Sequence, residues 1–315
     1  MKSRILACAL GAGGLVLGTL TAGQGLAAAA VQQGGTQTCT GTLAAPGQLS
    51  GSYSNLVIDG ACAIQNGPVH VSGNLTVAPN AILNAVFGAN GSRLTVDGNM
   101  VVQDNASVML GCGTVFANLW GLHGVINVPE FPCLDDPNPG APTLTSLDVI
   151  HGNLIVNQAL GVVLHDSTVD GNVTQTGGGG GESCDPAGVF NQDVGFPPYS
   201  SYIDSTVHGN VTVTNLTTCW FGMFRNQIGG NAVNTNIVNG DIDGNEDEGN
   251  IIHGNFSCQN NSPADQWGDG DSASNQVAGN ATGMCGFDVQ VLNPAPEAGV
   301  IGVTPVPIHV SVPLR

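Results

Sequence analysis

A short phrase that recurs along most of the chain constrains the fold more than any other feature. Its core is an aliphatic residue, one variable residue, Gly-Asn and a further apolar residue, and two copies, STVDGNVTQT and STVHGNVTVT, are nearly identical. The phrase returns in steps of about 19 to 28 residues, apart from one step of 38 that we interpret as two steps of 19, and such repetition indicates stacked units that cannot bury their apolar faces alone. The glycines that mark the copies are Gly73, Gly98, Gly124, Gly152, Gly171, Gly209, Gly230, Gly254 and Gly279.

Short runs between these glycines, such as PVHV and SRLTV, are rich in Val, Ile and Thr and alternate with period two, which indicates strands. A repeated unit of two or three strands predicts one coil of a parallel β-helix, whose coils stack at about 4.8 Å. Gly-Asn then forms a corner, where both residues tolerate left-handed backbone and Asn side chains stack. An antiparallel sandwich also has short strands but does not repeat its corner sequence. We therefore predict an all-β parallel β-helix (solenoid) of about 9–10 coils, stapled by disulfides.

The N-terminal segment has the layout of a secretory signal peptide. Lys2 and Arg4 precede an apolar stretch, and small residues follow where cleavage is expected, so we predict a signal peptide at residues 1–30. No second long apolar run follows. We expect a secreted protein, extracellular or associated with the cell envelope, that does not contact the membrane after cleavage.

The remaining chain is expected to form one elongated domain. We assign the β-helix to residues 31–290 and an extended C-terminal strand or tail to 291–315. Insertions near 130–146 and 177–204 interrupt the repeat. Insertions in repeat proteins fall on one face and often build the binding surface, although a disulfide-tied loop without a ligand is the simpler interpretation.

The cysteines that follow the signal peptide form an even set, which favours disulfides over metal thiolates in a secreted chain. Only sequence neighbours lie close together in a solenoid, so we expect consecutive cysteines to pair. The predicted pairs are Cys39–Cys62, Cys112–Cys133, Cys184–Cys219 and Cys258–Cys285.

The chain is strongly acidic, with 23 Asp and Glu against 5 Lys and Arg. Two of the basic residues, Lys2 and Arg4, would leave with the signal peptide. The remaining surface repels nucleic acid and anionic lipid, so we exclude nucleic acid as a partner. An anionic polysaccharide would need bound cations to approach it.

Two acidic segments are candidates for a calcium site. Asp241, Asp243 and Asn245 have the alternate spacing of a calcium loop, but the loop lacks the Gly at its sixth position and the Glu at its twelfth, so it is not an EF-hand. A less regular calcium site that adds Asp247 or Glu248 is one interpretation, and a solvated acidic face is the other. We expect no other cofactor. A second cluster of similar character contains Asp265, Asp269 and Asp271.

Histidine often stands immediately before the corner glycine. His123, His151 and Asp170 come from consecutive predicted coils and would stack in steps of about 4.8 Å, which suits a metal or a pH-sensitive ladder. The same slot also holds Gly229 and Ala278, which indicates a turn position that does not require a particular side chain. The histidines in this slot are His123, His151, His208 and His253.

Aromatic residues are concentrated in CWFGMFRN, which contains Trp220, Phe221 and Phe224. Exposed rings here, together with Trp267, could stack on sugars, so we consider Trp220, Phe221 and Trp267 as ligand-binding candidates. Such a cluster more often fills a core or covers an open end.

The segment Gly254–Phe287 contains Gly-Asn-x-x-Cys, an Asn-rich stretch with Pro, Asn-x-Val-x-Gly and a closing Cys. It resembles the C-terminal signature of uncharacterised secreted actinobacterial Gly-Asn-repeat proteins, and the STVxGNVTV copies extend the resemblance over about Leu75–Phe287. The resemblance implies a right-handed parallel β-helix of the pectate-lyase-like class outside the cell. It implies no activity.

The wider β-helix class includes pectate lyases and polygalacturonases, so an enzyme must be judged by its site. Lyases of this class use a basic residue and calcium, and Arg93 and Arg225 are the internal basic candidates. The polygalacturonase motifs Asn-Thr-Asp and Gly-His-Gly are absent. Asp135 and Asp136 form a double carboxylate without a visible partner, which argues against hydrolysis by a carboxylate pair.

These observations favour a secreted, non-catalytic β-helix protein with a cell-envelope, adhesion or surface-binding role. A cell-wall or extracellular polysaccharide is the expected partner. The alternative is a polysaccharide lyase or glycoside hydrolase of the same class, and we lean against an enzyme. A third interpretation, an ice-binding face suggested by TQTCTGT at Thr36–Thr42, is weakened because the Thr pattern does not persist from repeat to repeat.

Overall fold

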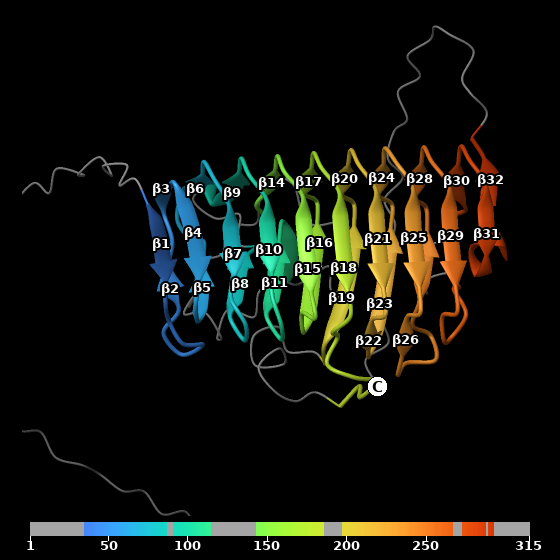
Figure 1. Cartoon of the computed structure of the whole chain (residues 1–315), viewed down its shortest axis with the longest axis horizontal. Coiled ribbons are helices and arrows are strands. Elements are labelled where there is room, and N and C mark those ends of the chain that lie inside the picture. Colours follow the sequence, from blue (N-terminus) through green and yellow to red (C-terminus); the bar gives the residue numbers. More distant parts are fainter. Residues whose placement is uncertain are drawn as a thin grey trace, which may run out of the picture. The chain divides into compact units, whose positions relative to one another are not determined.

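Most strands belong to three parallel sheets, which the chain enters in rotation, one strand at a time (Figure 1). The structure, a computed structural model, describes residues 35–86, 91–114, 143–185, 197–266, 273–287 and 289–292. After a strand of sheet 1, the chain forms a strand of sheet 2 and one of sheet 3 over most of its length. It then returns to sheet 1 beside its earlier strand. We call one such passage a rung.

The strands of each sheet are given in their spatial order. Sheet 1 contains β1 (Thr36–Cys39), β4 (Asn55–Ile58), β7 (Leu75–Val77), β10 (Met100–Val102), β15 (Leu154–Asn157), β18 (Val173–Thr176), β21 (Val211–Thr214), β25 (Ala232–Thr235), β29 (Phe256–Gln259) and β31 (Ala281–Gly283). Sheet 2 contains β2 (Gly47–Gln48), β5 (Ala61–Ala63), β8 (Ile82–Ala85), β11 (Ser107–Leu110), β16 (Gly161–His165), β19 (Tyr199–Ile203), β23 (Trp220–Phe224) and β27 (Glu246–Glu248). Sheet 3 contains β3 (Gly51–Tyr53), β6 (Pro68–Val71), β9 (Arg93–Val96), β14 (Val149–Ile150), β17 (Thr168–Val169), β20 (Thr206–Val207), β24 (Gln227–Ile228), β28 (Ile251–Ile252), β30 (Asn275–Val277) and β32 (Val289–Val291).

Three smaller features complete the described fold. The strands β12 (Cys112–Thr114) and β13 (Thr143–Thr145) pair antiparallel. The strands β22 (Thr217–Thr218) and β26 (Val238–Asn239) pair parallel. A short 3-10 helix, η2 (Met284–Phe287), follows β31.

The two near-identical phrases of the sequence lie side by side, position for position. Val173–Thr176 of β18 pair with Val211–Thr214 of β21, and Thr168 of β17 pairs with Thr206 of β20. Each residue therefore faces its own equivalent on the next rung, which explains why the phrase is repeated. The step of 38 residues is consequently one rung that contains the insertion, and not two steps of 19. The long parallel sheets confirm the predicted all-β parallel architecture and exclude the antiparallel sandwich.

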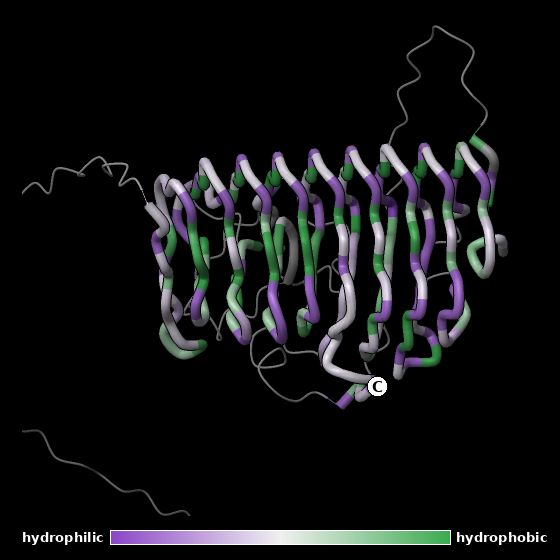
Figure 2. The backbone as a smooth tube through the Cα atoms, in the orientation of Figure 1, coloured by the Kyte–Doolittle hydropathy of each residue, from purple (hydrophilic) through white to green (hydrophobic). Residues whose placement is uncertain are grey.

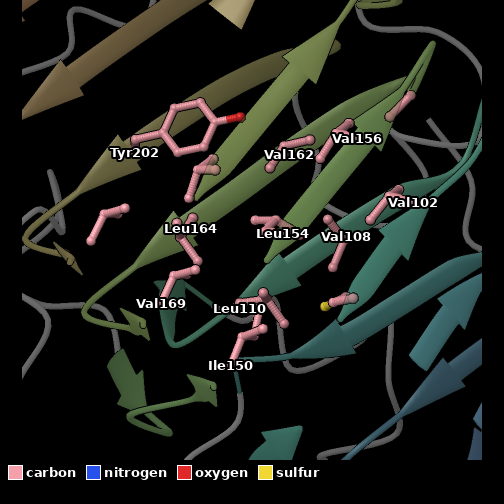
Figure 3. Packing of buried hydrophobic residues seen from close by; sticks show 14 of the residues in the cluster. Val102, Val108, Leu110, Ile150, Leu154, Val156, Val162, Leu164, Val169 and Tyr202 are labelled. Carbon is pink, nitrogen blue, oxygen red and sulfur yellow. The ribbon is translucent and has the colours of Figure 1, made fainter. Parts of the chain in front are cut away.

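Alternate residues of the strands point into a continuous apolar interior (Figure 3). Leu154 and Val156 of β15 belong to the same cluster as Val162 and Leu164 of β16, and all four side chains are fully buried. The alternation is visible along the strands as changes between hydrophobic and hydrophilic colours (Figure 2). Sheet 2 also buries apolar residues on a second face. That smaller cluster contains Ala61, Ala63, Ile82, Val86, Met109 and Val163.

The Gly-Asn corner joins sheet 3 to sheet 1, and its backbone differs from our expectation. None of the described corner glycines or asparagines is left-handed. Successive corners instead approach so closely that the Gly209 N–H donates to the Gly171 carbonyl at 3.0 Å. A Cβ on Gly209 would lie 2.5 Å from that oxygen, so glycine is required by space and not by φ.

Left-handed residues other than glycine lie mainly at the two other corners, and those that follow sheet 1 are mostly Asn, which tolerates this conformation. Those between sheets 1 and 2 are Asn80, Asn105, Gln158, Asn215, Asn236 and Asn260, and those between sheets 2 and 3 are Leu147, Asp166, Asp204 and Arg225. The sequence thus indicated the correct residue type for a left-handed corner but assigned it to the wrong corner.

A second polar ladder, which we did not predict from the sequence, lies buried just before the strands of sheet 3. Asn226 Nδ2 donates to Asn250 Oδ1 at 2.9 Å, and Asn250 Nδ2 donates to Asn275 Oδ1 at 2.9 Å. Each member stands four residues before a corner glycine, so a search for polar residues at that offset would have found the ladder. Its members are Asp148, Ser167, Ser205, Asn226, Asn250 and Asn275.

Disulfides tie rungs together at three places. The bonded pairs are Cys39–Cys62, Cys184–Cys219 and Cys258–Cys285, as the consecutive scheme predicts. The fourth predicted pair, Cys112–Cys133, lies partly outside the described residues, as do the predicted signal peptide, the insertion near 130–146 and most of the tail. Within the described ranges, no helix has the length and apolar character needed to cross a membrane.

The close approach at the Gly-Asn corner predicts that Gly209→Ala is strongly destabilising. The added methyl group would displace the Gly171 carbonyl, and we expect the free energy of unfolding to fall by about 1–3 kcal/mol. Chemical denaturation of the disulfide-intact protein measures the change. Gly286→Ala is the matched control, because a Cβ there meets no atom within 4 Å, and it should be nearly neutral. Equal effects of the two changes would contradict the spatial argument.

Asp148 predicts a pH dependence of stability. Burial raises the pKa of this carboxyl from 3.8 to about 7, although the Leu94 and Gly111 N–H groups donate to it at 2.7 and 3.0 Å. Between these two pH values the folded state holds a proton that the unfolded state has lost. Stability should therefore fall by up to about 4 kcal/mol as pH rises from 4 to 7.

Asp148→Ser isolates this contribution, because Ser occupies the same ladder position on the next two rungs. Unfolding measured against pH should show a smaller decline in the variant than in the wild-type protein. Identical slopes for the two proteins would show that Asp148 does not hold the proton.

Candidate functional site

A shallow groove of about 520 Å³ runs across four neighbouring strands of sheet 1, β15, β18, β21 and β25. Each strand contributes one residue from the outer face of the sheet, and the corner before it contributes an asparagine. The lining residues are Asn153, Ile155, Asn172, Thr174, Asn210, Thr212, Asn231 and Val233. The groove therefore crosses the strands, and each rung gives it one asparagine and one β-branched residue.

The middle of this face is a rank of β-branched side chains, one per strand. The register places equivalent residues in line, so neighbouring members are separated by the strand spacing of about 4.8 Å. Branching at Cβ restricts their χ1 rotamers, which keeps the rank ordered before any ligand binds. We call this the central rank, and its members are Thr38, Val57, Thr76, Val101, Ile155, Thr174, Thr212, Val233, Ser257 and Thr282.

The central rank extends further than the sequence suggested. Thr alone recurs irregularly, but Val and Ile take its place on other strands, so the β-branched shape persists at every position except Ser257. A second, shorter rank lies two residues further along the strands. Its members are Asn157, Thr176, Thr214, Thr235 and Gln259.

The other wall of the groove is an asparagine ladder at the Gly-Asn corners. Asn172 Oδ1 accepts the backbone N–H of Asn210 and its side-chain Nδ2–H, both at 2.9 Å. The same pair of bonds joins Asn210 to Asn231. From Asn99 to Asn231, each amide oxygen accepts two N–H groups from the next rung, and each NH₂ group from Asn153 to Asn255 keeps one N–H for a ligand or water. The ladder consists of Asn55, Asn74, Asn99, Asn153, Asn172, Asn210, Asn231, Asn255 and Asn280.

The strands of sheet 1 contain no charged residue, although the chain carries 23 acidic residues. Their one aromatic residue, Phe256, is fully buried in the core. The outer face of sheet 1 therefore offers amide and hydroxyl groups with short aliphatic side chains. It lacks the aromatic platform on which sugar rings commonly stack and the charges that attract ions.

The histidine slot beside this face brings together two of the residues we predicted, His151 and Asp170, and adds His208 as their third member. Asp170 accepts hydrogen bonds from His151 Nδ1 at 2.6 Å and from His208 Nδ1 at 3.0 Å, and all three side chains are substantially exposed. The bond from His151 is the main cause that lowers the pKa of Asp170. A similar pair joins His70 Nε2 to Asp97 at 2.9 Å. His123 lies outside the described residues.

The predicted calcium loop is divided between two environments. Asp241 and Asp243 are exposed, and the Asp243 N–H donates to Asp241 Oδ1 at 3.1 Å. Asn245, Asp247 and Glu248 are buried. The five residues therefore do not share one solvent-accessible site. Of the second predicted cluster, Asp265 is buried, whereas Asp269 and Asp271 lie outside the described residues.

Asp247 instead lies beside Asp265 in the protein interior. Their carboxylates, together with Cys258 Sγ, lie within 4.8 Å of one another, and no other group of three such ligands is found in the described part of the chain. Asn234 Nδ2 donates to both Asp247 oxygens at 3.0 Å. Burial, followed by repulsion from Asp265, raises the pKa of Asp247, and burial also raises the pKa of Asp265.

The predicted aromatic ligand site is not assembled on the surface. Phe221 is fully buried and packs edge-to-face on Tyr202, with ring centroids 6.2 Å apart. Trp220 is half-buried and stacks on Phe224 at 5.8 Å. Trp220 and Phe221 belong to β23 of sheet 2, so they do not line the groove. Trp267 lies outside the described residues.

The basic residues considered for catalysis are separated. Arg225 forms a two-point ion pair with Asp204, with Nε–Oδ1 and Nη2–Oδ2 distances of 2.7 Å. Arg93 is exposed in β9 of sheet 3, several strands from Arg225. The double carboxylate Asp135-Asp136 lies outside the described residues.

Comparison with known proteins finds no family model that matches the chain, and neither a curated protein nor a solved structure that matches it. The functional argument therefore depends on the geometry and chemistry of the described residues.

Proposed function

We propose that this chain is a secreted, non-catalytic right-handed parallel β-helix (solenoid) with a cell-envelope, adhesion or surface-binding role. Rotation of the chain through three parallel sheets supports the β-helix, because each rung returns beside the previous one. The three disulfides support an oxidising compartment outside the cytoplasm. The resemblance to secreted actinobacterial Gly-Asn-repeat proteins is consistent with both.

The ligand that this proposal assigns to the groove is an extended, neutral polysaccharide of the cell wall or extracellular matrix. The observation that carries it is the uncharged outer face of sheet 1 in a strongly acidic chain. The negative field of the protein repels acidic polymers but not neutral ones. Asn172 with Thr174 and Asn210 with Thr212 each place an amide beside a hydroxyl in the middle of the groove, and Ile155 and Val233 flank them with aliphatic surface. A polymer with regularly spaced hydroxyl groups complements such a row.

Ice is a second candidate ligand for the same face, and the regular central rank favours it. A flat array of short β-branched and hydroxyl side chains at a constant spacing is suited to an ordered water surface. An enzyme has less support, because Arg225 is held by Asp204 and the neighbouring carboxylates of Asp247 and Asp265 are buried.

Thr212→Tyr should weaken binding by at least about tenfold (~1.4 kcal/mol), because a bulky ring would block the middle of the groove. Thr206→Tyr is the matched control, since Thr206 lies close to Thr212 in the sequence and is also half-buried, but belongs to β20 of sheet 3. Retention of the purified, disulfide-intact protein on a panel of insoluble neutral polysaccharides measures the effect.

The same variants distinguish the other interpretations. Adsorption to growing ice that Thr212→Tyr abolishes, without retention on any polysaccharide, would assign the face to ice. Release of reducing or unsaturated ends from a polysaccharide would contradict a non-catalytic role. Equal loss of binding in both variants would show that sheet 1 is not the binding face.

A further inference from the structure

The interior of the last rungs contains two carboxylates that the groove does not use. Asp247 belongs to β27 and is 1% exposed, while Asp265 lies beyond β29 and is 5% exposed. Asn261 Nδ2 donates to both oxygens of Asp265 at 3.1 Å, as Asn234 Nδ2 does to those of Asp247. Two amides therefore hold the two carboxylates facing each other.

A buried amide oxygen without a donor lies at the same place. Asn234 is completely buried and its amide group faces Asp247, yet its Oδ1 has no hydrogen-bond partner. Asn239 Oδ1 and Asn245 Oδ1, from the segment that leads into β27, are also buried without a partner. Native proteins leave few buried polar atoms unpaired, and several in one segment indicate a missing ligand such as an ion or water.

The charge of the pair also requires compensation. An ionised carboxylate in the interior costs several kcal/mol unless a partner neutralises it. The described basic side chains are Arg93, on the exposed surface of sheet 3, and Arg225, which is paired with Asp204. Two solutions remain for Asp247 and Asp265: they share a proton, or they bind a cation.

We propose that Asp247, Asp265 and Asn234 form a buried Ca²⁺ site. All three offer oxygen ligands, which hard cations prefer. Cys258 is bonded to Cys285, so its sulfur is not a thiolate and a zinc site is disfavoured. Rotation of the Asn234 amide about its terminal bond exchanges Nδ2 for Oδ1 and turns the unpaired oxygen toward the ion.

This site differs from the loop that the sequence suggested, because it excludes the exposed Asp241 and Asp243. The ion would join β25, β27 and the segment after β29, which come from adjacent rungs near the C-terminal end of the sheets. Calcium would thus stabilise the folded state and would not take part in recognition at the groove. The proposal is independent of the ligand that sheet 1 binds.

Thermal unfolding of the disulfide-intact protein at pH 7, with excess Ca²⁺ or with chelator, tests the site. We expect Ca²⁺ to raise Tm by about 5 °C, since a ligand that binds only the folded state stabilises it. Asp247→Asn should abolish the shift while nearly preserving side-chain shape. Asp243→Asn is the matched control, because it removes an exposed carboxylate from the same segment, and it should keep the shift.

Metal analysis after dialysis provides a second measurement, with one Ca²⁺ per chain expected for the wild-type protein. Asp265→Asn replaces Asp247→Asn if the latter does not fold. Absence of both bound Ca²⁺ and a Tm shift in the wild-type protein would overturn the proposal and leave the shared proton as the explanation. Loss of the shift in Asp243→Asn but not in Asp247→Asn would also overturn it, in favour of the exposed loop.

Discussion

The contact between successive Gly-Asn corners is the constraint on which the rest of the structure depends. The backbone of one corner glycine donates directly to the carbonyl of the previous one, and no space remains for a side chain. The asparagine that follows adds two further bonds to the same neighbour. Together these contacts fix the register at one point on every rung. A slip by one residue would place a Cβ in the contact and turn each strand inside out.

Because the register is fixed, every position of the repeat becomes a column along the stacked rungs. Inward columns are mostly aliphatic and merge into the core. One inward column is polar, and it changes along the chain from Asp148 through Ser167 and Ser205 to Asn226, Asn250 and Asn275. These side chains bond to one another and to backbone groups, so burial of polar atoms is compensated within the ladder. Next to Asp247, by contrast, the buried Oδ1 of Asn234 remains without a partner.

Outward columns have different chemistry on each sheet, and this difference supports the functional proposal. Sheet 2 buries apolar residues on its second face. The corner beside sheet 1 displays the exposed His151, Asp170 and His208. Sheet 1 has only neutral groups, arranged in ranks by the same register that stabilises the fold. An acidic protein thus keeps one long face free of charge. Charged groups elsewhere on the surface favour solubility, while the uncharged face can contact a neutral ligand.

The sequence by itself determined the strands, their parallel stacking, the period of most rungs and the pairs Cys39–Cys62, Cys184–Cys219 and Cys258–Cys285. Each of these follows from a signal that is local or periodic, such as the alternation in VTVT or the recurring Gly-Asn. The sequence showed that Thr recurs irregularly, but it did not show that Val101 and Ile155 continue the rank that Thr174 and Thr212 form. The rungs differ in length, so only the pairing of strands in three dimensions shows which residues occupy equivalent positions.

Only the tertiary structure decided which polar residues are buried and which meet. Asp241 and Asp247 belong to one acidic run, yet the first is exposed and the second is in the interior beside Asp265. Trp220 and Phe221 are neighbours in sequence, but alternation along β23 buries the Phe221 ring completely. Local composition cannot distinguish these cases, because the environment of a side chain depends on the strand face it occupies and on the rungs that pack against it.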